Sequence, residues 1–179
     1  QWLQDALTAI GLRPISALVD ITNYFTFDLC RPLHVFDVAL VKGDTLTVTL
    51  SKGGETMAAL NDKSYTLPEG VTAISDASGV EALGGVVGGR PTGCEAGTTD
   101  VFLEVALFDP VRTARTGRLL AITSDARYRF ERGVDPAAMH DYAALATQMI
   151  LEICGGEASE LTVAGKVPDT TRTYTLRPD

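Results

Sequence analysis

The run TLTVTL at residues 45–50 alternates threonine with leucine and valine, and this alternation sets the prediction for the middle of the chain. A period of two residues is typical of a strand with one apolar face. Gly43-Asp44 and Gly53-Gly54 predict turns at its two ends. A hairpin is expected around Asn61-Asp62-Lys63. The middle is therefore predicted to be β-rich, with further short strands over residues 56–60, 64–67, 71–76 and 80–82.

Helical patterns flank this β-rich region. Residues 2–10 carry apolar side chains at helical spacing, and Gly11 follows as a helix stop. Residues 109–120 are predicted to be a helix with Pro110 in its first turn. Asp135-Pro136 is expected to open a long helix that ends at Gly155-Gly156. The apolar face expected for that helix consists of Met139, Tyr142, Leu145, Ala146, Met149, Ile150 and Ile153. The predicted fold class is α+β, with a β-rich, sandwich-like core flanked by helices.

Five other segments give weaker patterns. Residues 15–19 fit either a short buried strand or the start of a helix. Asp20 and Thr22 are candidate caps for a helix that runs to Leu29. An apolar strand is expected over residues 100–108. The remaining two segments are 127–131, which is left unassigned, and 161–163, which is expected to form a last strand.

The composition limits the class of protein. The chain has 179 residues, of which 45% are hydrophobic, enough for a sizeable core. With 15 basic and 23 acidic side chains the net charge is -8, which argues against a domain that grips nucleic acid mainly by long-range attraction. No run of about 18 apolar residues is present, so no membrane-spanning segment is expected. The widely spaced Cys30, Cys94 and Cys154 fit reduced thiols in a cytosolic protein.

A polar cluster lies among residues that otherwise belong to a core. It consists of Thr22 and Asn23 in the run VDITNY at residues 19–24, and of His34 in the run RPLHVFD at residues 31–37. Buried polar groups are costly unless they find partners, so His34 is either a satisfied structural histidine or a group that orients a substrate or a water. Without a second nearby histidine a metal centre is not expected. No G-x-S-x-G run offers an exposed serine nucleophile.

Two other features suggest a ligand. The run LGGVVGG at residues 83–89 lacks the G-K-[ST] of a phosphate-binding loop, so it is either a tight bend or a place where a ligand approaches bare backbone. Glu104 stands in the middle of an apolar strand. It either points to solvent by strand alternation or lies in a pocket, where it could accept a hydrogen bond from a substrate hydroxyl.

The basic residues are unevenly distributed. Residues 112–132 carry a local charge of +4 in a chain of net charge -8. Arg112, Arg115 and Arg118 recur every third residue, on one face of the expected helix. This segment is the one plausible phosphate-facing patch, and its alternative is a solvated or salt-bridged helix face.

Taken together, five ordered motifs strongly resemble the B3/B4 region of bacterial phenylalanyl-tRNA synthetase beta subunits. The likeness covers residues 1–165, and residues 166–179 are expected to be a linker or the start of a following domain. The chain opens in what looks like the middle of a helix, so a domain of a longer protein is expected. The motifs are RPIS at 13–16 leading to VDITNY at 19–24, RPLHVFD at 31–37, LGGVVGG at 83–89, FLE at 102–104, and SDA at 124–126 through RFERGVDP at 129–136.

The resemblance implies a function for several of these residues. In that family the B3/B4 region hydrolyses tyrosine that has been wrongly esterified to phenylalanine tRNA, while aminoacylation takes place on the alpha subunit. Glu104 matches the family's hydroxyl-reading glutamate, and Gly88, with Gly85, matches the glycine whose backbone assists it. The positions that line the ester and the terminal adenosine correspond to His34, Thr22, Asn23 and Arg13. The segment that closes the amino-acid pocket corresponds to Ser124 and Ala126.

The resemblance also sets expectations for the mechanism and the partners. Hydrolysis by a positioned water is expected, with His34 and Asn23 orienting the water or the ester. The expected partners are the acceptor end of a tRNA and the alpha subunit of an alpha2-beta2 synthetase, in the cytoplasm. No cofactor or metal is expected in this domain, since ATP and magnesium belong to the whole synthetase. Many relatives differ next to the histidine and near Ser124, so the outer contacts are less secure than Glu104 and His34. The alternatives are a structural module of the synthetase, or an amino-acid-binding or RNA-binding module without chemistry.

Overall fold

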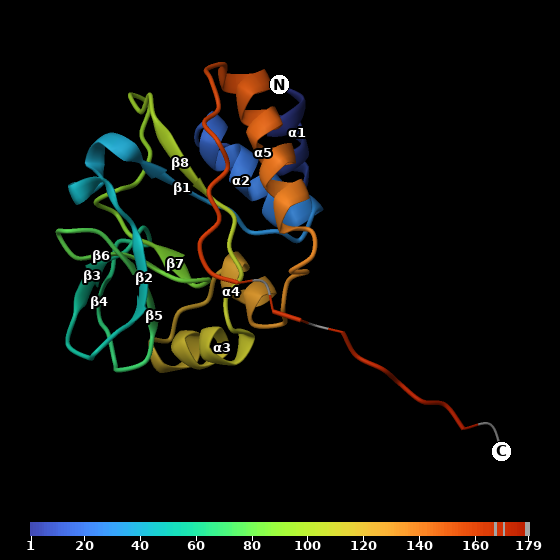
Figure 1. The fold of residues 1–179 in the computed structure, drawn as a ribbon. Coiled ribbons are helices and arrows are strands. Elements are labelled where there is room, and N and C mark those ends of the chain that lie inside the picture. The colour runs from blue at the N-terminus through green and yellow to red at the C-terminus, as the bar shows by residue number, and fades with distance from the viewer. Residues whose placement is uncertain (167, 170, 178–179) are drawn as a thin grey trace.

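The fold is taken from a computed structural model, which describes residues 1–166, 168–169 and 171–177. Helices and antiparallel strands both contribute, so the predicted α+β class is confirmed (Figure 1). The helices are α1 (Trp2–Ala9), α2 (Ala17–Asp28), α3 (Pro110–Leu119), α4 (Asp125–Phe130) and α5 (Met139–Cys154), with the 3-10 turns η1 (Val38–Leu40) and η2 (Lys42–Asp44). The strands are β1 (His34–Asp37), β2 (Thr47–Leu50), β3 (Thr56–Ala58), β4 (Ser64–Thr66), β5 (Thr72–Ser75), β6 (Val80–Leu83), β7 (Val87–Gly88) and β8 (Val101–Glu104).

The strands form three small antiparallel sheets. The four-stranded sheet has the order β2-β5-β6-β7, and the predicted hairpin pairs β3 with β4. The third sheet is a two-stranded ribbon of β1 and β8, which lie far apart in the sequence. The alternation at residues 45–50 is confirmed as strand β2, which pairs with β5. Strands β1 and β7 were not predicted, because a strand of two to four residues carries too little periodicity to recognise.

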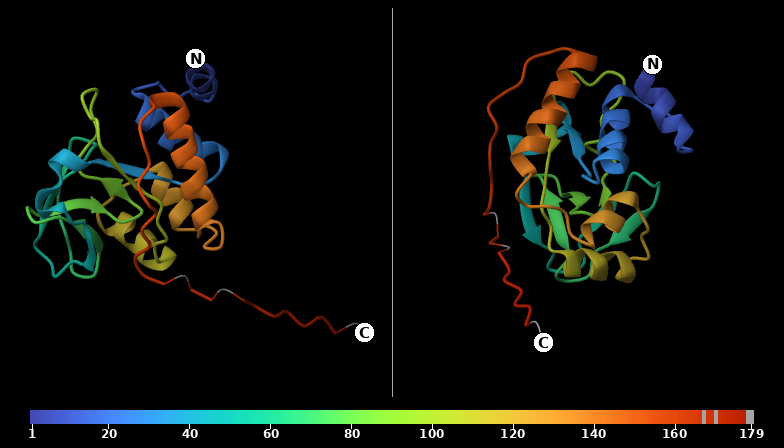
Figure 2. Two further views of the ribbon diagram at one scale, coloured as in Figure 1. Left: turned by 45° about the horizontal axis from the view of Figure 1, so that its top comes forward. Right: turned by 90° about the vertical axis from the view of Figure 1, so that its right-hand side faces the viewer.

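The β1–β8 ribbon lies between two halves of the molecule. Helices α1, α2 and α5 group on one side, and the four-stranded sheet and the hairpin lie on the other (Figures 1 and 2). Leu103 of β8 packs against the helical core, which contains Leu3, Leu7, Ile21, Phe25 and Ala146. Phe36 of β1 belongs instead to a cluster on the sheet side with Ile74, Ala82, Phe108 and Phe130. The two faces of the ribbon therefore pack into different halves.

Arg31 anchors the start of the ribbon to the helical half. The residue is only 1% exposed, and its guanidinium donates a hydrogen bond to the backbone carbonyl of Asp135, just before α5. The same guanidinium lies 4.9 Å from the ring centre of Tyr142 in α5, within range of a cation–π contact. These contacts fix where the chain enters β1 relative to α5.

Helix α2 begins earlier than either expected cap. Ser16 is the N-cap, with its hydroxyl accepting a hydrogen bond from the amide of Val19 at 3.4 Å. Asp20 is buried inside the first turn and accepts from the amide of Ile15 at 2.8 Å. Thr22 lies further inside the helix. The prediction that Asp20 or Thr22 caps the helix is therefore wrong, because Asp20 reaches back to the preceding backbone and allows the helix to start at Ala17.

The C-terminal part differs from the sequence prediction in three respects. Helix α5 begins at Met139 and not at Pro136, because Asp135 accepts from the amide of Ala137 at 2.9 Å and holds a turn there. Leu145 and Ile153, expected on its apolar face, are 45% and 41% exposed, and its fully buried residues are Ala143 and Ala146. Residues 161–163 form no strand and are exposed. No strand in the described part of the chain pairs with their backbone, and apolar side chains alone do not make a strand.

The described residues bear on two expectations from composition, a membrane-spanning segment and the state of the cysteines. Among them, no helix has the length and apolarity needed to cross a lipid bilayer. The three cysteines are free thiols, as the spacing predicts, and Cys30 and Cys154 are exposed.

Candidate functional site

His34 and Glu104 occupy opposite positions in the β1–β8 ribbon. They are register partners of an antiparallel pair, so their side chains lie on the same face of the ribbon. In such pairs the Cβ atoms lie about 4.5–5.5 Å apart. Leu103, the neighbour of Glu104, points the other way into the helical core. A shared site for His34 and Glu104, which the sequence alone could not establish, is therefore compatible with the fold.

The imidazole of His34 is enclosed by an aromatic ring and a glycine. The ring of Phe36 meets it edge to face, with centroids 4.4 Å apart. On the other side, a Cβ atom built on Gly88 would lie 2.4 Å from Cε1 of His34 and 3.0 Å from Nε2. Only glycine allows this approach, which accounts for glycine at the end of the two-residue strand β7.

The buried His34 has an unused hydrogen-bonding atom. Its Nε2 is buried and has no hydrogen-bond partner among the residues that the structure describes. Burial lowers the pKa of His34 to about 4, because the charged form is poorly solvated there. The imidazole is therefore neutral at physiological pH. It can orient a ligand or a water through Nε2, but it is too weak a base to take up a proton readily.

Glu104 is the second titratable group on this face. Desolvation raises its pKa to about 7, and its carboxyl group has no hydrogen-bond partner within the described part of the chain. Strand alternation turns Glu104 away from Leu103, as the sequence indicates. The face it occupies is not open solvent, however, because the sheet half of the molecule faces the ribbon there. The side chain is partly accessible, as a group that receives a ligand must be.

Leu60 completes the wall beside Gly88. Its amide donates a hydrogen bond to the carbonyl of Gly88 at 3.0 Å, and its Cδ1 lies 2.9 Å from the Cβ position of that glycine. Gly88 is therefore held between the imidazole of His34 and the side chain of Leu60. Leu60 is 51% exposed, so it forms an outer, apolar edge of the site.

The start of α4 is tied to the glycine-rich segment. Ser124 caps this helix by accepting from the amide of Arg127 at 3.0 Å, and its hydroxyl donates to the carbonyl of Val86. Ala126 packs against the cluster that contains Phe36. Ser124 and Ala126 thus lie near the candidate site and connect it to the sheet half.

Gly85 faces away from this site. It has a φ of +71°, and a Cβ atom there would lie 2.9 Å from the ring of Phe108 and 3.2 Å from that of Phe130. Of the two glycines singled out in the sequence, only Gly88 contacts His34. Gly85 forms the bend that brings Gly88 into place.

The remaining candidates lie on or before α2, which packs against β1. The hydroxyl of Thr22 donates to the carbonyl of Val19 at 2.9 Å, and Asn23 is half-buried. Arg13 is exposed in the turn before α2. No hydrogen bond or ion pair within the described residues joins Thr22, Asn23 or Arg13 to His34, so the structure shows no polar contact between these three and the centre of the site.

Sequence reasoning missed Phe36, Phe102 and Leu60. Phe36 and Phe102 are register partners on the same face as His34 and Glu104, and Phe102 is 48% exposed. A period of two from His34 and Glu104 would have found both. Leu60 offers no such signal, because it reaches the site through the packing of the hairpin beside β7.

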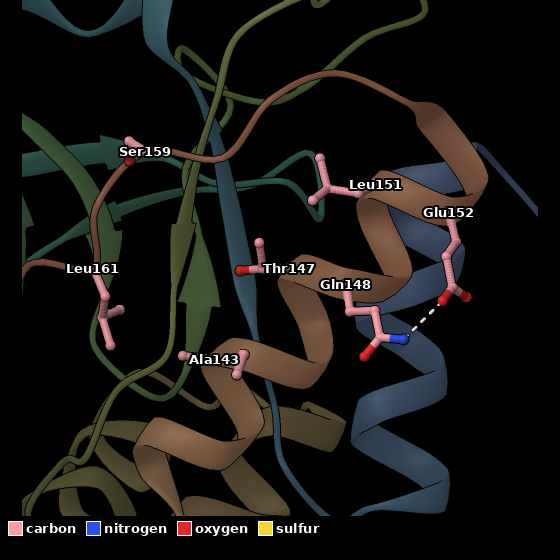
Figure 3. Close-up of a pocket in the computed structure, with 8 residues that line it drawn as sticks. Ala143, Thr147, Gln148, Leu151, Glu152, Ser159 and Leu161 are labelled. Carbon is pink, nitrogen blue, oxygen red and sulfur yellow. Dashed lines mark hydrogen bonds between the residues drawn. The ribbon is translucent and has the colours of Figure 1, made fainter.

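A separate cavity of about 570 Å³ lies between α5 and the segment that follows it (Figure 3). Gln148 and Glu152, joined by a hydrogen bond of 2.8 Å, stand on its α5 side. Its other lining residues are mostly apolar and include Ala143, Leu151 and Leu161. None of the candidate site residues lines this cavity.

The antiparallel ribbon, the glycine-rich segment and the α4 cap all lie within one continuous stretch of the chain, residues 34–130. The sequence matches the model of the B3/4 domain over residues 1–155, so the chain belongs to the B3/4 domain family. It is 63% identical over 179 residues to the phenylalanine–tRNA ligase beta subunit of Paramagnetospirillum magneticum, covering 100% of this chain and 22% of that protein.

Two further relatives carry the same name. The subunit from Rhodospirillum rubrum is 58% identical over 177 residues, covering 99% of this chain and 22% of that protein. The subunit from Ruegeria pomeroyi is 60% identical over 176 residues, covering 98% of this chain and 22% of that protein. The chain thus spans about a fifth of the length of these relatives, and the resemblance to the synthetase beta subunit is confirmed at the level of the domain family.

Proposed function

We propose that this chain is the editing domain of a phenylalanyl-tRNA synthetase beta subunit and hydrolyses the ester of tyrosine wrongly attached to phenylalanine tRNA. The observation that carries the proposal is the placement of Glu104 directly opposite His34, with Gly88 packed against the imidazole. A hydroxyl-reading group and a water-orienting group then face one bound amino acid.

Selectivity rests on Glu104. A pocket that accepts phenylalanine cannot strongly reject a side chain that merely adds a hydroxyl, whereas a pocket that hydrogen-bonds the hydroxyl strongly disfavours the ligand that lacks it. Glu104 suits this role, since its carboxyl group has no partner among the described residues and is poorly solvated. The tyrosine hydroxyl supplies the missing hydrogen bond, and phenylalanine leaves the carboxylate unpaired.

Hydrolysis needs a water held against the ester carbonyl. Nε2 of the neutral His34 accepts a hydrogen bond from this water and orients its oxygen toward the carbonyl carbon. The carbon–oxygen bond to the ribose breaks, the water oxygen stays on tyrosine, and a proton passes to the ribose oxygen. Asn23 and Thr22 flank the ester end, and Arg13 lies where the terminal adenosine would approach. Ser124 and Ala126 close the amino-acid side.

The wider assembly follows from the same proposal. The partners are the acceptor end of the tRNA and the synthetase alpha subunit, in an alpha2-beta2 enzyme of the cytoplasm that uses ATP and magnesium elsewhere. The whole enzyme holds the body of the tRNA. Only the acceptor end then has to enter this acidic domain.

The test follows tyrosine release from tyrosine-charged phenylalanine tRNA, by the chain alone and by the whole synthetase, beside a phenylalanine-charged control. We expect faster release of tyrosine, and Glu104→Ala should abolish the preference. The matched control is Glu95→Gln, which neutralises an exposed carboxylate in a loop. Equal release of the two amino acids, or selectivity that survives Glu104→Ala, would instead support a structural module without editing.

A further inference from the structure

The six arginines of residues 112–132 fall into two groups of three. The three arginines in and after α4 form ion pairs with acidic side chains. Arg127 pairs with Glu131 at 2.9 Å, Arg129 pairs with Asp125 at 3.4 Å, and Arg132 pairs with Glu131 at 3.0 Å. Two of them also lie over aromatic rings, Arg129 over Phe27 and Arg132 over Tyr128. Each of the three arginines in this half of the basic cluster therefore has an acidic partner, Asp125 or Glu131.

The other three arginines belong to α3 and have no acidic partner in the part of the chain that the structure describes. The side chains of Arg112, Arg115 and Arg118 make no ion pair and no hydrogen bond within residues 1–166 or the described residues beyond them. They recur every third residue, so neighbours in the series lie about 5–6 Å apart at Cβ. The opposite face of α3 is buried through Thr113, Thr116 and Gly117. The three guanidinium groups thus line the outer face of the helix.

The charge of this face contrasts with the rest of the chain. Residues 112–132 carry +4, whereas the other residues together carry -12. Arg112 and Arg115 border a shallow depression of about 210 Å³, together with Glu69 and Asp109. Asp109 is occupied as the N-cap of α3, where it accepts from the amide of Arg112. Val111 and Leu119, which lie at either end of the arginine series, are exposed and also line this depression.

The position of α3 connects this face to the candidate site. Helix α3 packs against α4, and Arg127 of α4 lies against Gly117 of α3. The N-cap of α4, Ser124, is bonded to the carbonyl of Val86, next to the strand that carries Gly88. Contacts from the glycine-rich segment through Ser124 to α4, and from α4 to α3, therefore join the candidate site to this helix, and α3 lies beside α4 in Figure 1.

We propose that the α3 face formed by Arg112, Arg115 and Arg118 docks the phosphate backbone of the RNA whose aminoacylated end enters the site. The proposal rests on the proposed editing function for the identity of the RNA. Charge complementarity favours a polyanion, because the guanidinium groups have no ion-pair partner among the described residues and the rest of the domain is acidic and repels a polyanion. The exposed apolar side chains of Val111 and Leu119 at the ends of the series can lie against ribose. Such contacts position the RNA and do not read its sequence.

The test measures binding of a hairpin RNA that carries the acceptor stem and CCA end of phenylalanine tRNA, as a function of salt concentration. The variant is the triple substitution Arg112→Gln, Arg115→Gln and Arg118→Gln, which keeps good helix formers on an exposed face. Each phosphate contact contributes about 0.7 to 0.9 to the slope of log K against log salt, so the slope should fall by about 2 to 3. The control removes the same charge from exposed lysines elsewhere, at Lys42, Lys52 and Lys166, and should leave the slope unchanged.

Release of tyrosine from charged tRNA separates this proposal from the editing function. The triple variant should raise KM and keep kcat, because none of its residues touches His34 or Glu104. The docking proposal would be overturned by any of three results: an unchanged slope in the triple variant, an equal fall of the slope in the lysine control, or no RNA binding by the unaltered chain. The face would then be assigned to a protein partner. A slope that falls as expected, in a chain without selective tyrosine release, would support docking and overturn editing.

Discussion

His34 and Glu104 face each other across the ribbon with pKa values in the reverse of their usual order. Burial lowers the pKa of the histidine to about 4 and raises that of the glutamate to about 7. Between these values both side chains are neutral, and above pH 7 a carboxylate faces a neutral imidazole. The pair therefore does not form an ion pair at any pH in this range. This arrangement leaves both groups free for a ligand.

The first prediction concerns the pH dependence of selectivity. Glu104 ionises as the pH rises through about 7, and the carboxylate penalises a ligand without a hydroxyl more strongly than the neutral acid does. The ratio of tyrosine release to phenylalanine release should therefore rise between pH 6 and pH 8. Taking the ratio cancels the hydroxide-dependent background. In Glu104→Gln the ratio should be flat with pH, and a parallel rise in that variant would contradict the assignment.

The second prediction concerns stability. A carboxyl group whose pKa is raised in the folded state binds its proton more tightly there. The contribution of that bound proton to the free energy of unfolding is present below the unfolded pKa and is lost as the pH rises through about 7. Glu104→Gln should therefore raise the free energy of unfolding at pH 8 by roughly 2 to 3 kcal/mol, reduced by the partial accessibility of the side chain. At pH 4 the change should be small. Urea unfolding at the two pH values checks this difference.

The third prediction concerns the outer wall of the site. Leu60 and Gly88 help to exclude water from His34, so Leu60→Ala should admit solvent and raise the pKa of His34 from about 4 toward 6.5. Titration of the imidazole C–H resonances by NMR measures the shift. His140, exposed on α5, gives a reference resonance in the same sample. An unmoved His34 pKa would show that Leu60 does not shield the ring.

The fourth prediction uses the close approach of Gly88. In Gly88→Ala the new methyl group would lie 2.4 Å from Cε1 of His34, so the ring must move and tyrosine release should fall by at least tenfold. The matched control is Gly97→Ala, since a Cβ atom there meets nothing within 4 Å. Thermal unfolding distinguishes displacement of the ring from general destabilisation. Retained activity in Gly88→Ala would remove His34 from the mechanism.

Sequence patterns predicted the parts of this fold that depend on local periodicity. The alternation at residues 45–50 and the hairpin around Asn61-Asp62-Lys63 were confirmed, as was the helix after Asp109. The start of α2 was missed because it depends on Asp20 reaching back to the amide of Ile15. The strand predicted over residues 161–163 was wrong because no strand among the described residues pairs with it. The first error depends on a local side-chain contact and the second on strand pairing, and residue periodicity encodes neither.

The candidate site was predictable only in its parts. Residue type and the surrounding apolar sequence were enough to name His34, Gly88 and Glu104 as candidates. The register that places His34 opposite Glu104 depends on pairing between segments about 70 residues apart. Leu60 could not be named at all. The arginine cluster appeared uniform in the sequence. Its division into compensated and unpaired halves emerged only from the contacts of Asp125 and Glu131.

The ribbon that carries His34 and Glu104 consists of four residue pairs, and its two faces pack into different halves of the molecule. A slip of one residue between the strands would exchange the faces, because side chains alternate along each strand. Leu103 would then face the glycine-rich segment, and Glu104 would enter the helical core. Loops on either side of β8 can therefore vary in length during evolution only if this frame is kept. The packing of Val35 and Leu103 thus fixes the register of the two strands, and the register determines which side chains face the ligand.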